Sequence, residues 1–153
     1  MPTSEADCPF CDIVRGNDPD AHEIYRNEDV VAFFPTEPAV LGHTLVVPRP
    51  HVECVWELDP ALAASLGVAT VALSKAVRRS IAPDGLNLIQ SNGAVASQTV
   101  FHVHVHILPR WEGDEIGPVW PAETNYSEQA KDDALNALRA ECRTLMADMP
   151  RRD

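Results

Sequence analysis

Three histidines, His102, His104 and His106, stand at alternate positions in an otherwise apolar run from 100 to 109. Side chains of a β-strand alternate between two faces, so the three imidazoles are expected to share one face. The apolar residues between them then point into a core. Histidine changes charge near neutral pH and can act as a nucleophile, acid, base or metal ligand. The row therefore predicts a chemically active strand.

Three interpretations of the row remain open. In the first, the histidines are ordinary polar residues on a half-exposed strand. In the second they bind one metal ion, but zinc needs ligand nitrogens within about 3.5 Å of each other, and His102 and His106 lie roughly 13 Å apart along a strand. In the third, His104 is a nucleophile flanked by a histidine at roughly 6.6 Å on each side. That spacing suits an anion such as phosphate, and we favour this interpretation.

The segment from 92 to 99 supports a phosphate site, because it is rich in small residues that let backbone amides approach an anion. Asn92, Gln98 and Thr99 add neutral polar groups to it.

The elements that must position these residues follow from local patterns. Asp59 and Pro60 predict the start of a long helix that runs to about residue 80. The other expected elements are a short helix at 8–15, strands at 22–26, 30–35, 42–48, 86–91 and 100–109, and an amphipathic helix at 127–146. This order predicts an α+β fold, an antiparallel five-stranded sheet with a long helix between strands and a C-terminal helix. We expect a disordered lead at 1–7, a domain at 8–126, and a helix and tail at 127–153 packing on that domain.

Composition narrows the function further. The chain has 153 residues and a formal net charge of −11, which argues against a nucleic-acid polymer or an anionic membrane as partner. It shows no wholly apolar run of 18 residues and no signal peptide, so we expect a cytoplasmic protein without a membrane span. The four cysteines are then expected to be reduced rather than paired in disulfides.

The segment from Gln98 to Arg110, Gln-Thr-Val-Phe-His-Val-His-Val-His-Ile-Leu-Pro-Arg, resembles the signature of the histidine triad (HIT) superfamily. The segment 42–48, together with His51 and the Ala32-Phe33 pair, resembles the N-terminal strands of that family. The resemblance covers most of residues 8–112.

The resemblance implies a nucleotide hydrolase or nucleotidyltransferase. His104 would attack the α-phosphorus of a nucleoside phosphoramidate or a dinucleoside polyphosphate, giving a covalent histidine–nucleotide intermediate that water hydrolyses. By the same match His106, Gln98 and Thr99 would contact the phosphate, with Thr99 or a neighbouring histidine assisting the leaving group. Asn92 would hold the phosphate or ribose side. Phe10, Ile13 and Phe33 resemble the base pocket of the family, or are ordinary core.

Two positions depart from the family pattern. Pro35 stands where members that cleave purine phosphoramidates usually carry an acidic residue for the ribose hydroxyls, and Thr36 or Glu37 could substitute for it. Ser97 stands where a glycine usually precedes the glutamine.

Cys8 and Cys11 form a C-x₂-C pair, which has the spacing of half a structural zinc site. Free thiols and a redox pair are the alternatives, although no strand precedes the pair as in thioredoxin-like proteins. Resemblance to some bacterial HIT proteins implies that His51 and His102 complete a Cys₂His₂ zinc site. Such a closed set would stabilise the fold rather than react.

The sequence thus predicts an enzyme that binds a small nucleotide, with structural zinc and no catalytic metal. The family resemblance adds a homodimer. The alternatives are a nucleotide-binding regulatory module with little turnover and a zinc-stabilised interaction protein.

Overall fold

The computed structural model describes residues 4–148 and divides into two compact units, one ending at Gly117 and one beginning at Pro118. The first unit holds the sheet and every residue of the site described below. Within the predicted disordered lead, Glu5–Asp7 form a 3-10 turn, and the Glu5 carboxylate lies 2.7 Å from the Arg15 guanidinium. Residues 1–3 lie outside the described residues.

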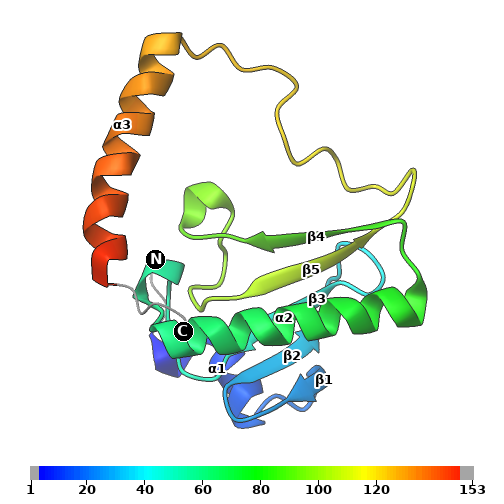
Figure 1. Cartoon of the computed structure of the whole chain (residues 1–153). Coiled ribbons are helices and arrows are strands. Elements are labelled where there is room, and N and C mark those ends of the chain that lie inside the picture. Colours follow the sequence, from blue (N-terminus) through cyan, green and yellow to red (C-terminus); the bar gives the residue numbers. More distant parts are fainter. Residues whose placement is uncertain (1–3, 149–153) are drawn as a thin grey trace. The chain divides into compact units, whose positions relative to one another are not determined.

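Five antiparallel strands form one sheet, in the spatial order β1-β2-β3-β5-β4 (Figure 1). They are β1 (His22–Arg26), β2 (Val30–Phe34), β3 (Thr44–Pro48), β4 (Gly85–Gln90) and β5 (Val105–Arg110). The long helix α2 (Pro60–Ile81) connects β3 to β4. The predicted α+β fold is therefore confirmed, including the place of the long helix.

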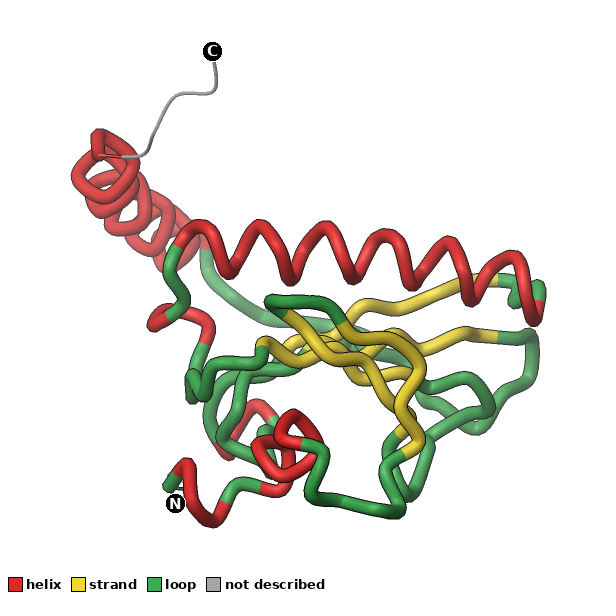
Figure 2. The backbone as a smooth tube through the Cα atoms, turned by 90° about the horizontal axis from the view of Figure 1, so that it is seen from below, coloured by secondary structure: helices red, strands yellow, loops and turns green. Residues whose placement is uncertain are grey.

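The two faces of the sheet carry different layers. Alternate residues of β2 and β3 pack with the short helix α1 (Pro9–Arg15) on one face and with α2 on the other. The α1 side includes Phe33 and Leu45, whereas Ala32 and Val46 belong to the cluster on the α2 side. Figure 2 shows α2 along one face of the strands and the short N-terminal helix α1 on the opposite face. The site lies on the α1 side.

Helix α2 begins where the sequence predicts. Asp59 is its N-cap, and its carboxylate accepts hydrogen bonds from the amides of Ala61 and Leu62 at 2.9 and 3.0 Å. Contrary to expectation, an 18-residue window of α2 reaches a mean hydropathy of 1.5, so its length and composition alone would permit a membrane span. Leu66 and Ala69 on its inner face belong to the core cluster on the α2 side of the sheet.

The second unit contains α3 (Glu128–Leu145), close to the helix predicted at 127–146. Its N-cap is Ser127, whose hydroxyl accepts from the Ala130 amide. None of the helix residues is buried, and Leu138 and Leu145 are exposed. Packing of this helix on the first unit stays a prediction.

The strand predicted over 100–109 was too long, because β5 begins only at Val105. Along the predicted strand, Val105 is the first residue that pairs with a neighbouring strand, and it lies opposite Val46 of β3 and Gln90 of β4. The Val103 amide donates instead to the Val52 carbonyl at 2.7 Å, so His102 and His104 lie in an irregular segment before β5. The alternation of faces nevertheless continues through this segment, with Val103 in the cluster that packs on α2.

Ser97→Gly is expected to stabilise the fold by about 1 kcal/mol and to raise Tm by about 2–4 °C, because a left-handed backbone costs a residue with a Cβ about that much. Ser97 has φ +68° and ψ +22°, so it keeps a glycine-like conformation. Ala82, with φ +45° at the end of α2, should respond to Ala82→Gly in the same direction. Gly93→Ala is the opposite control, since Gly93 has φ +84° and open space around its Cβ position. Thermal unfolding checks the signs; a Ser97→Gly variant that is no more stable would contradict the argument.

Candidate active site and metal centre

A cleft of about 900 Å³ opens on the α1 side of the sheet. Its walls come from α1, from β2 and the segment after it, and from the residues just before β3. The remaining wall is the segment 99–106, which we call the histidine segment. The lining includes Phe10, Ile13, Phe33, Pro35, Thr36, Glu37, His43, Thr99, His104 and His106. The structure thus brings together His104, His106, Thr99 and the three predicted base-pocket residues.

His104 is held as one tautomer. Its Nδ1 lies 2.7 Å from the backbone carbonyl of His102. A carbonyl can only accept, so Nδ1 carries the proton and Nε2 keeps a free lone pair. The side chain is buried, and the Phe10 ring packs edge-on against it with centroids 5.2 Å apart. An unprotonated imidazole nitrogen in this cleft is a competent nucleophile.

His106 is held as the other tautomer, with its proton on Nε2. The residue that sets this tautomer is His43, which was not predicted from the sequence as a site residue. The Ala39 amide donates to His43 Nδ1 at 3.1 Å, so His43 carries its proton on Nε2. That Nε2 lies 2.8 Å from His106 Nδ1 and donates to it. His106 therefore carries its proton on Nε2, as a hydrogen-bond donor. Its ring centroid lies 4.8 Å from that of His104, so a bare nitrogen and an N–H donor lie side by side.

A sequence signal for His43 did exist. His43 precedes β3 by one residue and is two positions from Leu45, which pairs with His106 across the sheet. Positions two apart in an extended chain share a face, so a fourth histidine could have been placed beside the row once the pairing of these strands was assumed.

Burial lowers the pKa of His43, His104 and His106 below the ordinary value of 6.5. For His43 and His104 burial is the main cause. The pKa of His106 falls to about 4, through burial first and then through the neighbouring His104 and His43. The neutral forms that the hydrogen bonds require are therefore the stable forms at neutral pH.

We expect kcat/KM to be flat from pH 8 to below pH 6.5, and then to fall by up to tenfold per pH unit as His104 takes up a proton. The free energy of unfolding should also decrease as the pH falls. The folded chain holds these histidines neutral while the unfolded chain protonates them near 6.5, so stability declines as the pH falls from 6.5 towards 4. A pH–rate profile checks this, with metal content measured at each pH as the control. An acid limb centred above pH 6.5 would contradict it.

The predicted phosphate loop is held together by its own polar groups. The Gln98 side chain is buried and accepts from the Gly93 amide at 2.7 Å, while its Nε2 donates to the Glu53 and Val100 carbonyls. The Asn92 carboxamide accepts from the Val55 amide at 2.7 Å. These contacts shape the loop. Direct phosphate contact by Gln98 and Asn92, neither of which lines the cleft, stays a prediction.

Aromatic and acidic residues share the rest of the cleft. The Phe10 and Phe33 rings meet edge-to-face with centroids 5.3 Å apart, and Ile13 lies beside the same cluster. Pro35, Thr36 and Glu37 all line the cleft, together with Asp18 and Asp20. Three carboxylates and no lysine or arginine are thus found among the described lining residues. Such a cleft repels ligands that carry many negative charges.

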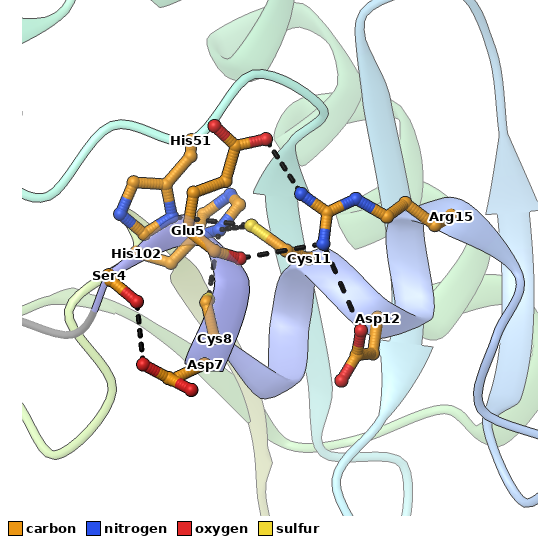
Figure 3. Close-up of polar contacts among 9 residues, drawn as sticks. All are labelled: Ser4, Glu5, Asp7, Cys8, Cys11, Asp12, Arg15, His51 and His102. Atoms are coloured by element: carbon orange, nitrogen blue, oxygen red, sulfur yellow. Dashed lines mark hydrogen bonds and ion pairs between the residues drawn. The ribbon is translucent and has the colours of Figure 1, made fainter.

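Next to the cleft, Cys8, Cys11, His51 and His102 converge, with one ligand atom of each within 4.8 Å of the others (Figure 3). His102 Nδ1 lies 3.5 Å from both sulfurs, and His51 Nδ1 lies 3.3 Å from the Cys11 sulfur. A tetrahedral zinc ion with Zn–S near 2.3 Å and Zn–N near 2.0 Å needs S–N edges of about 3.5 Å. The donor set and its spacing therefore fit zinc.

The surroundings of this centre also suit a cation. His102 Nε2 donates to the Pro48 carbonyl at 2.8 Å, which leaves Nδ1 bare toward the sulfurs, as a metal ligand requires. Burial, with the adjacent Cys8, raises the pKa of the Cys11 thiol to about 12, so thiolates here need a positive partner. Cys54 is buried outside the centre, and Cys142 is exposed on α3.

Known proteins share both the sequence and the fold. The family model of the HIT domain matches residues 17–113. Protein hit of Bacillus subtilis is 39% identical over 130 residues, which cover 84% of this chain and 88% of that protein. Adenylylsulfatase HINT3 of Arabidopsis thaliana is 34% identical over 122 residues, 80% of this chain and 60% of its own length.

Two crystal structures extend the comparison. A HIT family protein from Bacillus subtilis superposes with a TM-score of 0.80 at 36% identity, covering 88% of this chain and 96% of its own. A zinc-bound histidine triad protein from Mycobacterium smegmatis superposes with a TM-score of 0.69 at 30% identity, covering 90% of this chain and 99% of its own.

The fold is α+β with one antiparallel sheet, and alternating histidines lie beside a cleft. These are the features of the histidine triad class of proteins. The chain belongs to the HIT family.

Proposed function

We propose that this protein is a nucleotide hydrolase or nucleotidyltransferase that acts at the α-phosphate through a covalent histidine–nucleotide intermediate. The observation that carries the proposal is the pair of tautomers in the cleft: a bare Nε2 on His104 and an N–H on His106 Nε2. Each is set by a hydrogen bond to backbone, directly for His104 and through His43 for His106. A nucleophile beside a preorganised donor is the arrangement that phosphoryl-type transfer needs.

The reaction runs in two displacements. The lone pair of His104 Nε2 forms a bond to the α-phosphorus, and the bond to the leaving group breaks with its electron pair. The His106 N–H stabilises the negative charge on the non-bridging oxygens. Thr99, which lines the cleft, relays a proton from solvent water to the leaving group, and the attacking water of the second step returns a proton to solvent. Water then attacks phosphorus, releases the nucleoside monophosphate and restores neutral His104.

The charge of the cleft favours one of the two substrate classes. A dinucleoside polyphosphate places several negative charges among Asp18, Asp20 and Glu37, whereas a nucleoside phosphoramidate brings a single phosphate and an amine leaving group. We therefore propose the phosphoramidate class, with Thr36 or Glu37 accepting from the ribose hydroxyls where Pro35 cannot. The activity named for the Arabidopsis relative keeps an adenylyl sulfate as a further candidate of similar size.

Mass spectrometry of a reaction quenched in alkaline denaturant tests the function, because the N–P bond of a nucleotidyl histidine survives base and hydrolyses in acid. The protein is mixed with adenosine phosphoramidate, diadenosine polyphosphate or adenylyl sulfate, and an AMP adduct is expected on His104. Tight AMP binding with neither adduct nor product would instead support a regulatory module with little turnover. A protein that binds none of these nucleotides would support a zinc-stabilised interaction protein.

We further propose one structural Zn²⁺ per chain, held by Cys8, Cys11, His51 and His102. The two thiolates and two imidazoles fill a tetrahedral shell, so the ion would stabilise the fold and leave the chemistry to His104. The proposed homodimer would use exposed apolar residues such as Val68 and Val71 of α2, with exposed fractions of 72% and 52%, and Leu88 of β4. A cytoplasmic location stays part of this proposal.

A further inference from the structure

We infer that the metal centre and the nucleotide cleft are energetically coupled, so that metal bound by the two cysteines raises the affinity of the cleft for a nucleoside monophosphate. The inference rests on the proposed function, and it assigns positioning roles to Phe10 and His102. Two connections within the first unit carry it.

The first connection is Phe10, which lies inside the C-x₂-C segment itself. Cys8 and Cys11 direct their sulfurs to the centre, while Pro9 and Phe10 between them line the cleft. The Phe10 ring contacts His104 and Phe33, with centroids 5.2 and 5.3 Å away. Phe10 and Phe33 together form what we call the aromatic wall of the cleft. Any shift of either cysteine therefore moves this wall.

The anchorage of α1 makes that wall dependent on the centre. A helix of seven residues is too short to be stable alone. At its C-terminal end the Arg26 guanidinium donates to the Val14 and Ile13 carbonyls at 2.8 and 3.2 Å. At its N-terminal end, the polar contacts to the sheet side are those of the two sulfurs with His102 and His51. Metal at the centre would thus fix the end of α1 that carries Phe10.

The second connection is His102, which is bonded on three sides. Its Nδ1 faces the sulfurs, its Nε2 donates to the Pro48 carbonyl, and its own carbonyl accepts from His104 Nδ1. His102 lies before the start of β5, where the sheet ladder does not hold the backbone. A ligand bond at Nδ1 would therefore also fix the carbonyl that orients the nucleophile.

Coupling of this kind is reciprocal. If metal raises the affinity for AMP by some factor, AMP must raise the affinity for metal by the same factor. A passive structural metal that only holds the fold together would give a factor of one in both directions. A factor above one, equal in both directions within error, therefore separates coupling from a passive metal.

The test measures AMP binding by calorimetry in zinc-loaded and chelator-treated protein, with circular dichroism confirming that both are folded. We expect AMP to bind roughly tenfold more weakly without zinc, within the range typical of coupled sites. Competition with a chromophoric chelator should show zinc binding tightened by the same factor in saturating AMP. Phe10→Leu, which keeps all four ligands, should retain zinc and lose most of the coupling.

If the chelated chain unfolds, the same question is asked of folded, cobalt-loaded protein. AMP should then shift the d–d absorption of Co²⁺ in the wild type and leave it unchanged in Phe10→Leu. Equal AMP affinity with and without zinc, a silent cobalt spectrum, or full coupling in Phe10→Leu would overturn the inference alone. Failure of AMP to bind any form would overturn the proposed function together with it.

Discussion

His104→Gly is expected to lower kcat/KM for adenosine phosphoramidate by at least about 10⁴-fold, the usual scale for removing an attacking group. Its neighbour His106 cannot replace it, because the proton of His106 already occupies the nitrogen on the cleft side. The adduct seen by mass spectrometry should disappear in the same variant. Steady-state kinetics with substrate below KM give the measurement.

Two controls accompany this variant. AMP binding should survive within a few-fold, because the aromatic wall and His106 remain in place. Added imidazole should restore part of the activity by entering the space left by the ring and accepting the nucleotidyl group. If His104→Gly keeps activity within tenfold of the wild type, another residue is the nucleophile and the mechanism is wrong.

Removal of the metal should have the largest effect on stability. Cys8→Ser is expected to abolish zinc binding and to lower Tm by at least about 10 °C. Structural zinc contributes on the order of 10 kcal/mol in small zinc domains, and each kcal/mol corresponds to about 2–4 °C at this chain length. Protein purified without added zinc should contain one ion per chain, as measured by atomic emission.

Cys142→Ser is the matched control, because Cys142 is exposed on α3 and takes no part in the centre. Neither its metal content nor its Tm should change. A wild-type protein that contains no zinc and unfolds at the same temperature with and without a chelator would refute the metal site.

Local signals in the sequence predicted the elements well. The Asp59–Pro60 start of α2 was predicted as such. The caps that the structure shows at Ser127 for α3 and at Gly16 for α1 likewise depend on groups only a few residues apart. Such signals are written in neighbouring residues, so one sequence is enough to find them.

The features that sequence alone did not predict depend on distant partners. The bond between His43 and His106 joins residues 63 positions apart, and it gives His106 its tautomer. The late start of β5 follows from where β3 and β4 stop pairing. The loop role of Gln98 depends on the Glu53 carbonyl, 45 residues away. The four cysteine and histidine positions of the centre were expected together only because of the resemblance to bacterial HIT proteins.

The distance along the chain between the residues of the metal centre also sets an order of events during synthesis. Cys8 and His102 are separated by 94 residues and Cys11 and His51 by 40. At about 5–20 residues per second, the last ligand leaves the ribosome roughly 5 to 19 seconds after the first. Through that interval the cysteine segment has no complete partner set, and neither α1 nor the aromatic wall can take its final place. Maturation of the cleft therefore waits for the histidine segment.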